Sequence, residues 1–314
     1  METSFTRLVG CRYPLQQAAM GGVAGPELAG AVAAAGALGM LCEFDLEPST
    51  ERMTQALSVA GDGAVGMGFF GHWLHDDLAT FEEAATRLRL VEVFWTAPDA
   101  AIVDRARRSG GALMAWQVGT VDAAVAAADA GCDVVIVQGV EAGGHVRGTT
   151  PRDQLLDAVL AKVSLPVVVA GGIGTAQQVA TVIAAGAAGA RVGTRFVATT
   201  ESRGHPVYLQ ALVDAQSGDD TVLTEAFSGG WPDAPHRVLR SALDAAENFD
   251  GEVVGHVMRA RGREAMARFD VSTPSRQVEG EIAAMAMYAG TGVGEIRDVR
   301  SAADVVRELV SALG

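Results

Sequence analysis

Cysteine is scarce in this sequence. The 314 residues include three cysteines, Cys11, Cys42 and Cys132, which lie far apart and form no CxxC pair. An odd and scattered set of this kind argues against a disulfide framework and against a zinc knuckle. We therefore expect a protein of a reducing compartment, the cytoplasm.

Basic and aromatic side chains are also few. Lysine and arginine number 24 against 38 aspartates and glutamates, for a formal net charge of −14, and aromatic residues make up 5% of the chain. A nucleic-acid partner requires a basic face, so this balance argues against one. Alanine and glycine dominate instead, which suits close packing of helices on a sheet.

The sequence shows neither a signal peptide nor a clear membrane span. The N-terminal stretch METSFTRLVG lacks an apolar signal core. Residues 23–42 are apolar, but Gly25, Pro26 and Glu27 interrupt them. The segment divides better into one helix and one strand, so no membrane partner is expected.

Eight stretches typical of buried strands alternate with helical patterns over the first part of the chain. They are residues 15–20, 38–42, 64–69, 90–95, 112–117, 134–137, 167–170 and 190–192. Such alternation predicts an α/β fold with a parallel sheet, and eight units predict closure into a (β/α)8 TIM barrel. The alternative is a doubly wound open sheet, but no GxGxxG follows the first strand.

The alternation of strands and helices is lost after residue 198. Helical stretches without clear strands are expected at 206–217, 234–249, 252–267 and 278–287, and a last amphipathic helix is expected at 302–313. We therefore divide the chain into three parts. Residues 1–198 form the barrel, residues 199–287 form a small helical subdomain that walls the pocket, and residues 288–314 return to the barrel.

A buried strand delivers a polar, glycine-rich loop in VVIVQGVEAGGHVRGT, residues 134–149. In parallel α/β folds the active site lies beyond the carboxyl ends of the strands, and glycine lets the backbone approach a flat or anionic ligand. His145 lies in this loop. A free imidazole has a pKa of about 6.5 and can accept a proton at neutral pH, so His145 is the candidate general base. The alternative is a loop histidine that only shapes the pocket.

Two later strands each end in a glycine loop, Gly171-Gly172 and Gly193-Thr194. A parallel barrel commonly cradles a phosphate at this position, with backbone N–H groups and a helix N-terminus. Thr175 is the expected N-cap of the helix that follows the first loop. The alternative is that these glycines serve turn geometry alone.

The motifs QGVEAGGH, AGGIG and VGTRF together resemble the nitronate monooxygenase family (2-nitropropane dioxygenase-like flavoproteins). The similarity extends to YPLQQAAMGGVAGPELAGAVAAAGALGML and to YAGTGVGEI. It implies an FMN-dependent oxidoreductase that oxidises nitronates or nitroalkanes with O2, with His145 as general base. The same broad group is similar to NAD(P)H-dependent FMN reductases that act on a quinone or an enoyl thioester, which stays the alternative. A homodimer is one option for its assembly.

The family pattern also implies where FMN is bound. The flavin ring would pass the end of the first strand and the strand-end amides, and the phosphate would sit in the glycine loops. The implied cofactor contacts are Ala19, Met20, Gly21, Gly68, Gln117, Gln138, Gly143, Gly144, Gly171, Gly172, Gly193 and Thr194. The two amides can instead be satisfied strand-end groups. No metal ligand is implied.

The sequence departs from the family pattern at two single positions. Gly68 stands where asparagine is common, and Thr291 stands where glutamine is usual. These departures leave a third hypothesis, a flavin-binding accessory subunit or sensor without turnover. Four further residues are candidates for the pocket wall: Glu201, His205, His236 and Tyr288.

An unusual loop follows the third strand. His72 and His75 stand there beside Asp76 and Asp77, a combination that suggests a metal site. No third cluster of ligands supports such a site. The loop is therefore predicted to face the substrate or the solvent.

Overall fold

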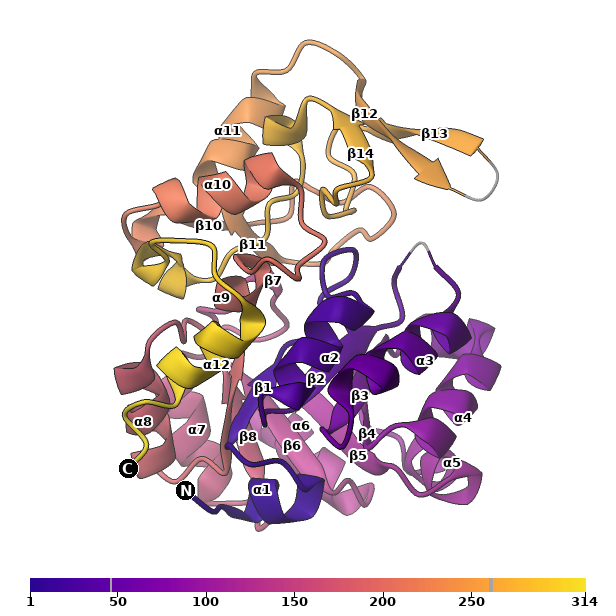
Figure 1. Cartoon of the computed structure of the whole chain (residues 1–314), viewed down its shortest axis with the longest axis vertical. Helices are drawn as coiled ribbons and strands as arrows, with labels where there is room; N and C mark the ends of the chain where they lie inside the picture. Colours follow the sequence, from indigo (N-terminus) through magenta and orange to yellow (C-terminus); the bar gives the residue numbers. More distant parts are fainter. Residues whose placement is uncertain (46, 260–261) are drawn as a thin grey trace.

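Eight parallel strands form a barrel in the computed structural model, which describes residues 1–45, 47–259 and 262–314. The strands are Leu15–Gln17 (β1), Gly39–Cys42 (β2), Val65–Phe70 (β3), Leu90–Phe94 (β4), Leu113–Val118 (β5), Val134–Gln138 (β6), Val167–Ala170 (β8) and Gly189–Val192 (β9). Their order is β1-β9-β8-β6-β5-β4-β3-β2, and a parallel bridge between Gln16 and Leu38 joins the two edge strands. The predicted (β/α)8 barrel is confirmed (Figure 1).

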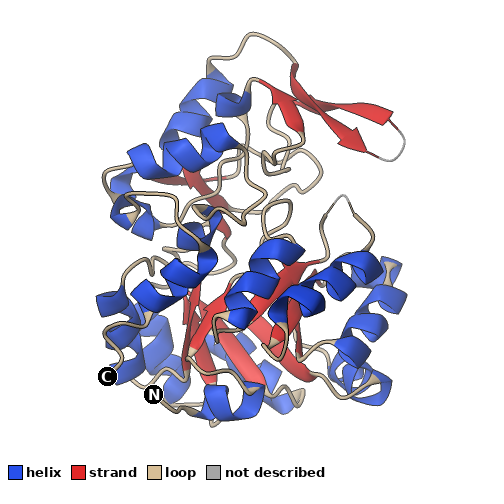
Figure 2. Cartoon of the chain, viewed as in Figure 1, coloured by secondary structure: helices blue, strands red, loops and turns tan. Residues whose placement is uncertain are grey.

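Helices cover the outside of this barrel (Figure 2). They are Pro26–Ala34 (α2), Ser49–Ala60 (α3), Leu78–Arg87 (α4), Ala100–Ser109 (α5), Val121–Asp129 (α6), Arg152–Leu160 (α7), Ala176–Ala184 (α8) and Ala302–Leu309 (α12). The helix Ser4–Val9 (α1) instead packs Phe5 and Val9 against the cluster inside the barrel. Thr175 caps α8 as predicted, because its hydroxyl accepts the N–H of Gln178 at 3.2 Å. Within the described residues, no helix is long and apolar enough to cross a membrane.

The barrel strands are apolar because both of their faces are covered. Val135 and Val137 of β6 pack toward the helices, whereas Val134 and Ile136 belong to the cluster inside the barrel. All four side chains are fully buried. A parallel strand covered on both faces has no solvent side, so a continuous apolar run replaces polar alternation.

The chain after β9 forms a second lobe above the barrel (Figure 1). Its elements begin with the short helix Thr194–Val197 (α9) and continue with Pro206–Asp214 (α10), Thr221–Thr224 (β10), His236–Leu239 (β11), Arg240–Glu247 (α11), Val253–Arg259 (β12), Gly262–Ala267 (β13) and Val278–Gly280 (β14). We call the elements from α10 to β14 the cap. The cap has its own hydrophobic cluster, which includes Tyr208, Leu212 and Phe227.

The prediction of helices without strands in this region is wrong. Strands β12 and β13 form an antiparallel hairpin where a helix was expected at 252–267, and β14 pairs with β12 where another was expected at 278–287. Residues 260–261 of the first stretch lie outside the described residues. Valines and Gly255 favour a strand over a helix, and Gly280 has a φ of +132° that a helix does not allow.

The helix expected at 234–249 begins only at Arg240. Residues 236–239 instead form β11, which pairs with β10 on one side. On its other side β11 pairs with Gly144–His145 (β7), a two-residue strand from the barrel loop after β6. The candidate base therefore lies on a strand that joins the barrel to the cap.

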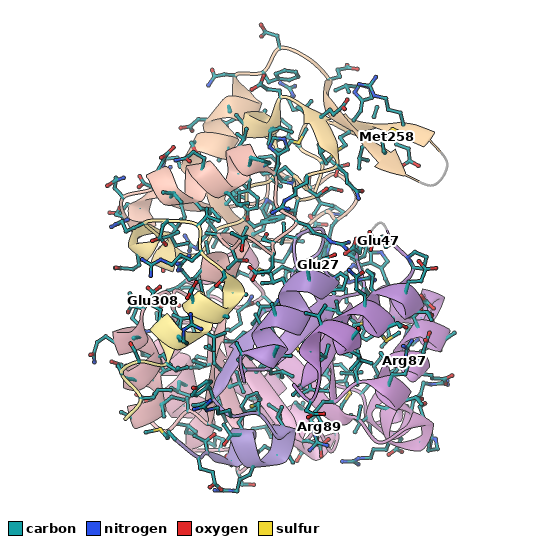
Figure 3. All side chains as sticks on the ribbon, in the orientation of Figure 1. Glu27, Glu47, Arg87, Arg89, Met258 and Glu308 are labelled. Carbon is teal, nitrogen blue, oxygen red and sulfur yellow. The ribbon has the colours of Figure 1, made fainter. Side chains whose placement is uncertain are left out.

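Ion pairs also join the two lobes. The guanidinium of Arg203, which precedes the cap, lies 3.0 Å from a carboxylate oxygen of Glu27 and 3.0 Å from one of Glu47. Glu27 and Glu47 lie at the edge of the barrel that faces the cap, and Met258 of β12 projects above them (Figure 3). The network fixes how the loop after β2 meets the second lobe.

Candidate active site

The carboxyl ends of the barrel strands open into a cavity of about 310 Å3 that the cap partly covers. Every residue predicted to bind the cofactor or act as base lines it: Ala19, Met20, Gly21, Gly68, Gln117, Gln138, Gly143, Gly144, His145, Gly171, Gly172, Gly193 and Thr194. The topology explains this grouping, because the carboxyl ends of parallel strands meet at one face of a barrel. The role of each residue remains a prediction.

Glycines let three loops approach one another closely at this face. A Cβ atom on Gly143 would lie 2.4 Å from the nitrogen of Gly290, and one on Gly172 would lie 2.6 Å from Oγ1 of Thr291. Thr291 also donates its N–H to the carbonyl of Glu141 at 2.9 Å. Thr291 thus bonds to the loop after β6 and packs against Gly172 of the loop after β8.

Backbone N–H groups in the same loops are free to bind an anion. Those of Gly172, Gly193 and Thr194 donate to no acceptor in the part of the chain that the structure describes. The Thr194 hydroxyl, in contrast, accepts the N–H of Gly290 at 3.0 Å. Unpaired N–H groups around a cavity are suited to phosphate oxygens.

Gly68 occupies a crowded position on β3. A Cβ atom there would lie 2.6 Å from Cβ of Ala19 and 3.2 Å from a carboxylate oxygen of Glu92. An asparagine at this position would require both neighbours to move. The absence of a side chain at residue 68 thus leaves room for Glu92.

The imidazole of His145 is half-buried against aromatic rings. The indole of Trp231 stacks on it with a centroid separation of 3.8 Å, and Tyr288 lies 5.6 Å away. Burial, and then the charges of His236 and His72, lower the pKa of His145 to about 3. The Nε2 atom is buried and makes no hydrogen bond within the described residues. His145 therefore presents a neutral nitrogen that lacks a partner.

The two predicted amides differ in their surroundings. Gln138 donates from Nε2 to the carbonyl of His145 at 2.9 Å and accepts the N–H of Arg147 at 3.4 Å, so its amide holds the loop that carries the candidate base. Gln117 is buried and makes no side-chain hydrogen bond to a described residue. Of the two, Gln117 has the free amide.

A buried ion pair lies in the cavity lining and was missed from the sequence. Arg191 of β9 bonds to Glu92 of β4, and Gln16 donates to the same carboxylate at 3.1 Å. Glu92 is 2% exposed and Arg191 6%. Each is the lone charge in an otherwise apolar strand, and that signal predicts pairing inside a barrel.

Aromatic side chains at the cavity were also missed. Phe44, Phe70, Trp73 and Trp231 all line it. Trp231 belongs to the loop between β10 and β11, directly after two glycines and before Pro232. A tryptophan among glycine and proline residues does not belong to the apolar face of a predicted helix or strand. Its presence in such a loop is therefore the sequence signal for a side chain that packs at a site.

The other candidates for the pocket wall have different outcomes. Tyr288 lines the cavity. His236 lies outside the lining. Its Nε2 accepts the N–H of Phe227 at 3.2 Å, and its Nδ1 lies 2.8 Å from the carbonyl oxygen of Ala234. His205 caps α10, and Glu201 accepts the N–H of Ala302 at 2.9 Å.

The described side chains of the loop at His72 do not gather as metal ligands, and the side chain of Asp76 lies outside the described residues. The ring of His72 lies 4.6 Å from Trp231, whereas His75 lines a separate depression beside Trp116. Among the described residues, no group of three or more histidine, cysteine, aspartate or glutamate side chains is placed to hold a metal ion. The loop therefore contributes to the aromatic side of the cavity.

Several known proteins are similar to this chain in fold and sequence. Over 269 residues the chain is 32% identical to the (3aS,4S,5R,7aS)-5-hydroxy-7a-methyl-1-oxo-octahydro-1H-indene-4-carboxyl-CoA dehydrogenase of Rhodococcus jostii, covering 83% of this chain and 72% of that protein. It is 30% identical to the nitronate monooxygenase npaC of Metarhizium robertsii, covering 90% and 86%. The nitroalkane oxidase of Streptomyces ansochromogenes superposes with a TM-score of 0.77 at 28% identity, covering 98% and 97%.

The family model described as nitronate monooxygenase matches residues 2–59 and 82–312. The unmatched interval contains the His72 loop, the departure noted in the sequence. The match on either side of it covers most of the chain, so the chain belongs to the nitronate monooxygenase family of oxidoreductase enzymes.

Proposed function

We propose that this protein binds FMN and oxidises nitronates or nitroalkanes with O2. The observation that carries the proposal is the buried, unpartnered Nε2 of His145 in the same cavity as the free N–H groups of Gly172 and Gly193. The unpartnered Nε2 suits an organic substrate with an acidic C–H, and the free N–H groups suit a phosphate. The nitronate monooxygenase npaC and the nitroalkane oxidase support the same chemistry.

The residues present fit FMN. The phosphate would be held by the N–H groups of Gly172, Gly193 and Thr194, where a side chain on residue 193 would project toward the cavity. The flavin ring would lie over Gly68 and beside Gln117, whose amide is free to donate to or accept from the ring edge. When bound, FMN would accept the electrons of the substrate and pass them to O2.

His145 would act on the proton of a neutral nitroalkane. Its neutral Nε2 accepts the Cα proton, whereas an anionic nitronate has already lost that proton and needs no base. Burial disfavours the imidazolium in the absence of substrate. The negative charge that forms on the substrate would favour it at the moment of transfer, because an opposite charge nearby raises the pKa of a histidine.

Gln138 would position this base. Its amide holds the backbone carbonyl of His145 and the backbone N–H of Arg147, so the stretch of loop from which the imidazole projects is held in place. A base held in place before the reaction loses less entropy in the transition state.

The test is a comparison of two assays on the purified protein. The proposal predicts bound FMN and O2 consumption when propyl-2-nitronate is added. Protein that carries no flavin even after FMN is supplied would refute it.

A second candidate is an NAD(P)H-dependent FMN reductase that acts on a quinone or an enoyl thioester. The similarity to a protein named as a carboxyl-CoA dehydrogenase favours this alternative. Rapid bleaching of the flavin by NADH without O2, together with no turnover of nitronates, would select it. Membership in a family of enzymes does not favour the third hypothesis, an accessory subunit without turnover.

The proposal also covers the second lobe, the cellular compartment and the assembly of the protein. Residues 199–287 would act as a unit that walls the pocket, consistent with the separate hydrophobic cluster of the cap. The protein would work in the cytoplasm on a small-molecule substrate. Assembly as a homodimer remains a prediction.

A further inference from the structure

A continuous wall of aromatic rings leads from the candidate base to the surface. Trp231 stacks on His145 at 3.8 Å, Trp73 lies 5.0 Å from Trp231, and Phe44 lies 4.5 Å from Trp73, all measured between ring centroids. Trp231 is 7% exposed, whereas Phe44 is 47% exposed. The wall therefore runs from the buried end of the cavity to its mouth.

Phe70 fills the space behind this wall. Its ring centroid lies 4.9 Å from that of Trp231 and 5.7 Å from that of Trp73. In a chain with 5% aromatic residues, such a concentration at one cavity is specific to the site. Aromatic rings packed edge to face present a rigid apolar surface that loses little entropy on binding.

The cap also contributes aliphatic side chains to the lining of the cavity. Val257 of β12, Met266 of β13 and Val271 all line it. Apolar groups therefore line the cavity beyond the aromatic wall as well. Apolar surface buried in this way favours an apolar ligand in proportion to its area.

The cations in the described lining already have partners. Arg191 is paired with Glu92. Arg195 lies 3.0 Å from Asp298 and 3.6 Å from Glu308. A carboxylate on the substrate would have to be desolvated in this cavity without a free cation to meet it, and such burial of an unpaired charge is costly.

We propose that the substrate carries an uncharged apolar tail, an alkyl chain of several carbons or an aryl ring, which lies along the wall from Trp231 through Trp73 to Phe44. The inference rests on the proposed function, because it names the class of nitronate that this cavity selects. Short nitronates that carry a carboxylate are poor substrates for the same reason.

The first test is the dependence of kcat/KM on the tail. From ethyl to hexyl nitronate we expect a rise of roughly fourfold for each buried methylene. The nitronate of 1-nitro-3-methylbutane is matched in shape to that of 3-nitropropionate, and we expect it to be preferred by at least about tenfold. A flat series, or a carboxylated nitronate that is used as well as its neutral match, would overturn the inference.

A variant at the mouth of the cavity connects this preference to the wall. Phe44→Ala removes a half-exposed ring at little risk to folding, and it should lower the preference for hexyl over ethyl nitronate by about tenfold. Phe44→Leu should retain most of it. Val59→Ala on α3, 44% exposed and outside the cavity lining, is the matched control and should keep the wild-type ratio. An unchanged ratio in Phe44→Ala counts against the wall.

A binding measurement separates this inference from the proposed function. Titration of the purified protein with 1-hexanol should change its tryptophan fluorescence at about a tenfold lower concentration than titration with hexanoate, and Trp231→Phe should reduce the signal. Equal binding of 1-hexanol and hexanoate overturns the inference that the cavity selects an uncharged apolar tail. Selective binding of 1-hexanol without turnover of any nitronate would refute the proposed function but would still support the apolar binding site along the aromatic wall.

Discussion

The indole of Trp231 stacks on the imidazole of His145, with ring centroids 3.8 Å apart and ring planes 20° apart. The contact places a side chain of the cap on the candidate base of the barrel. It covers one face of the imidazole with an apolar ring while Nε2 remains without a partner. Trp231 thus helps to keep His145 neutral and able to accept a proton.

Replacement of His145 separates proton removal from the later chemistry. His145→Ala should lower the turnover of neutral nitroalkanes by ~10²–10⁴, the usual contribution of a positioned base. Oxidation of the preformed nitronate should fall far less, because its proton is already gone. Both rates are measured by O2 consumption at equal FMN content. An equal loss with both forms would assign His145 to positioning or charge stabilisation, and no loss with either would mean that the base lies elsewhere.

The pH dependence of stability reports on the same histidine. In the unfolded chain the imidazole protonates near its ordinary pKa of 6.5, whereas the folded protein lowers this pKa to about 3. Above pH 6.5 both states are neutral. As the pH falls from 6.5 toward 3, the unfolded state binds a proton that the folded state does not, so stability falls by up to about 1.4 kcal/mol per pH unit.

The contribution of His145 to the pH dependence of stability is obtained by comparing the wild type with a variant that lacks the imidazole. Denaturant unfolding of the wild type and of His145→Ala is measured at several values of pH, and the difference in their free energies should change across this window. Above pH 6.5 the difference should be constant. A difference that does not depend on pH at all would show that His145 titrates normally in the folded protein.

Gly193 tests the phosphate site without a clash inside the protein. A Cβ atom there would meet Cβ of Ala18 at 3.5 Å and Sδ of Met20 at 3.7 Å, both ordinary contacts, and the φ of −111° suits any residue. Gly193→Val should therefore fold but contain little FMN, because its methyl groups occupy the place of the anion. Gly193→Ala should retain more. Flavin absorbance per protein measures both, and full occupancy in Gly193→Val would place the phosphate elsewhere.

The buried pair of Glu92 and Arg191 contributes to stability in a way that depends on both partners. Glu92→Gln leaves a buried guanidinium without its counter-charge and should cost about 3–5 kcal/mol of unfolding free energy. The double variant Glu92→Met with Arg191→Met removes both charges and should cost much less. Losses of Glu92→Met and Arg191→Met that simply add up in the double variant would contradict a direct coupling between the two side chains.

The barrel could be predicted because its signals are local and repeated. Each strand is a short apolar run, each is followed by a helical pattern, and eight such units have one common solution. The site residues followed from the same rule, since Gln138, Gly172 and Gly193 all stand where a strand ends. Topology then brought them to one cavity.

The cap could not be predicted in this way, because its strands depend on partners remote in sequence. Residues 236–239 form a strand only because β10 and β7 lie on either side. Trp231 and Arg191 were missed for a related reason, since the stack on His145 and the bond to Glu92 join segments far apart in the chain. Such pairings are tertiary, and local propensity does not record them.

The pairing of β7 with β11 has a consequence for protein engineering. His145 of the barrel loop and His236 of the cap are register partners in one small sheet, so the position of the candidate base depends on both lobes. A chimaera that joins this barrel to the cap of a relative would change the strand on which the histidine rests as well as the wall of the pocket. A lobe swap that keeps this pairing therefore requires that residues 144–145 and 236–239 be transplanted together.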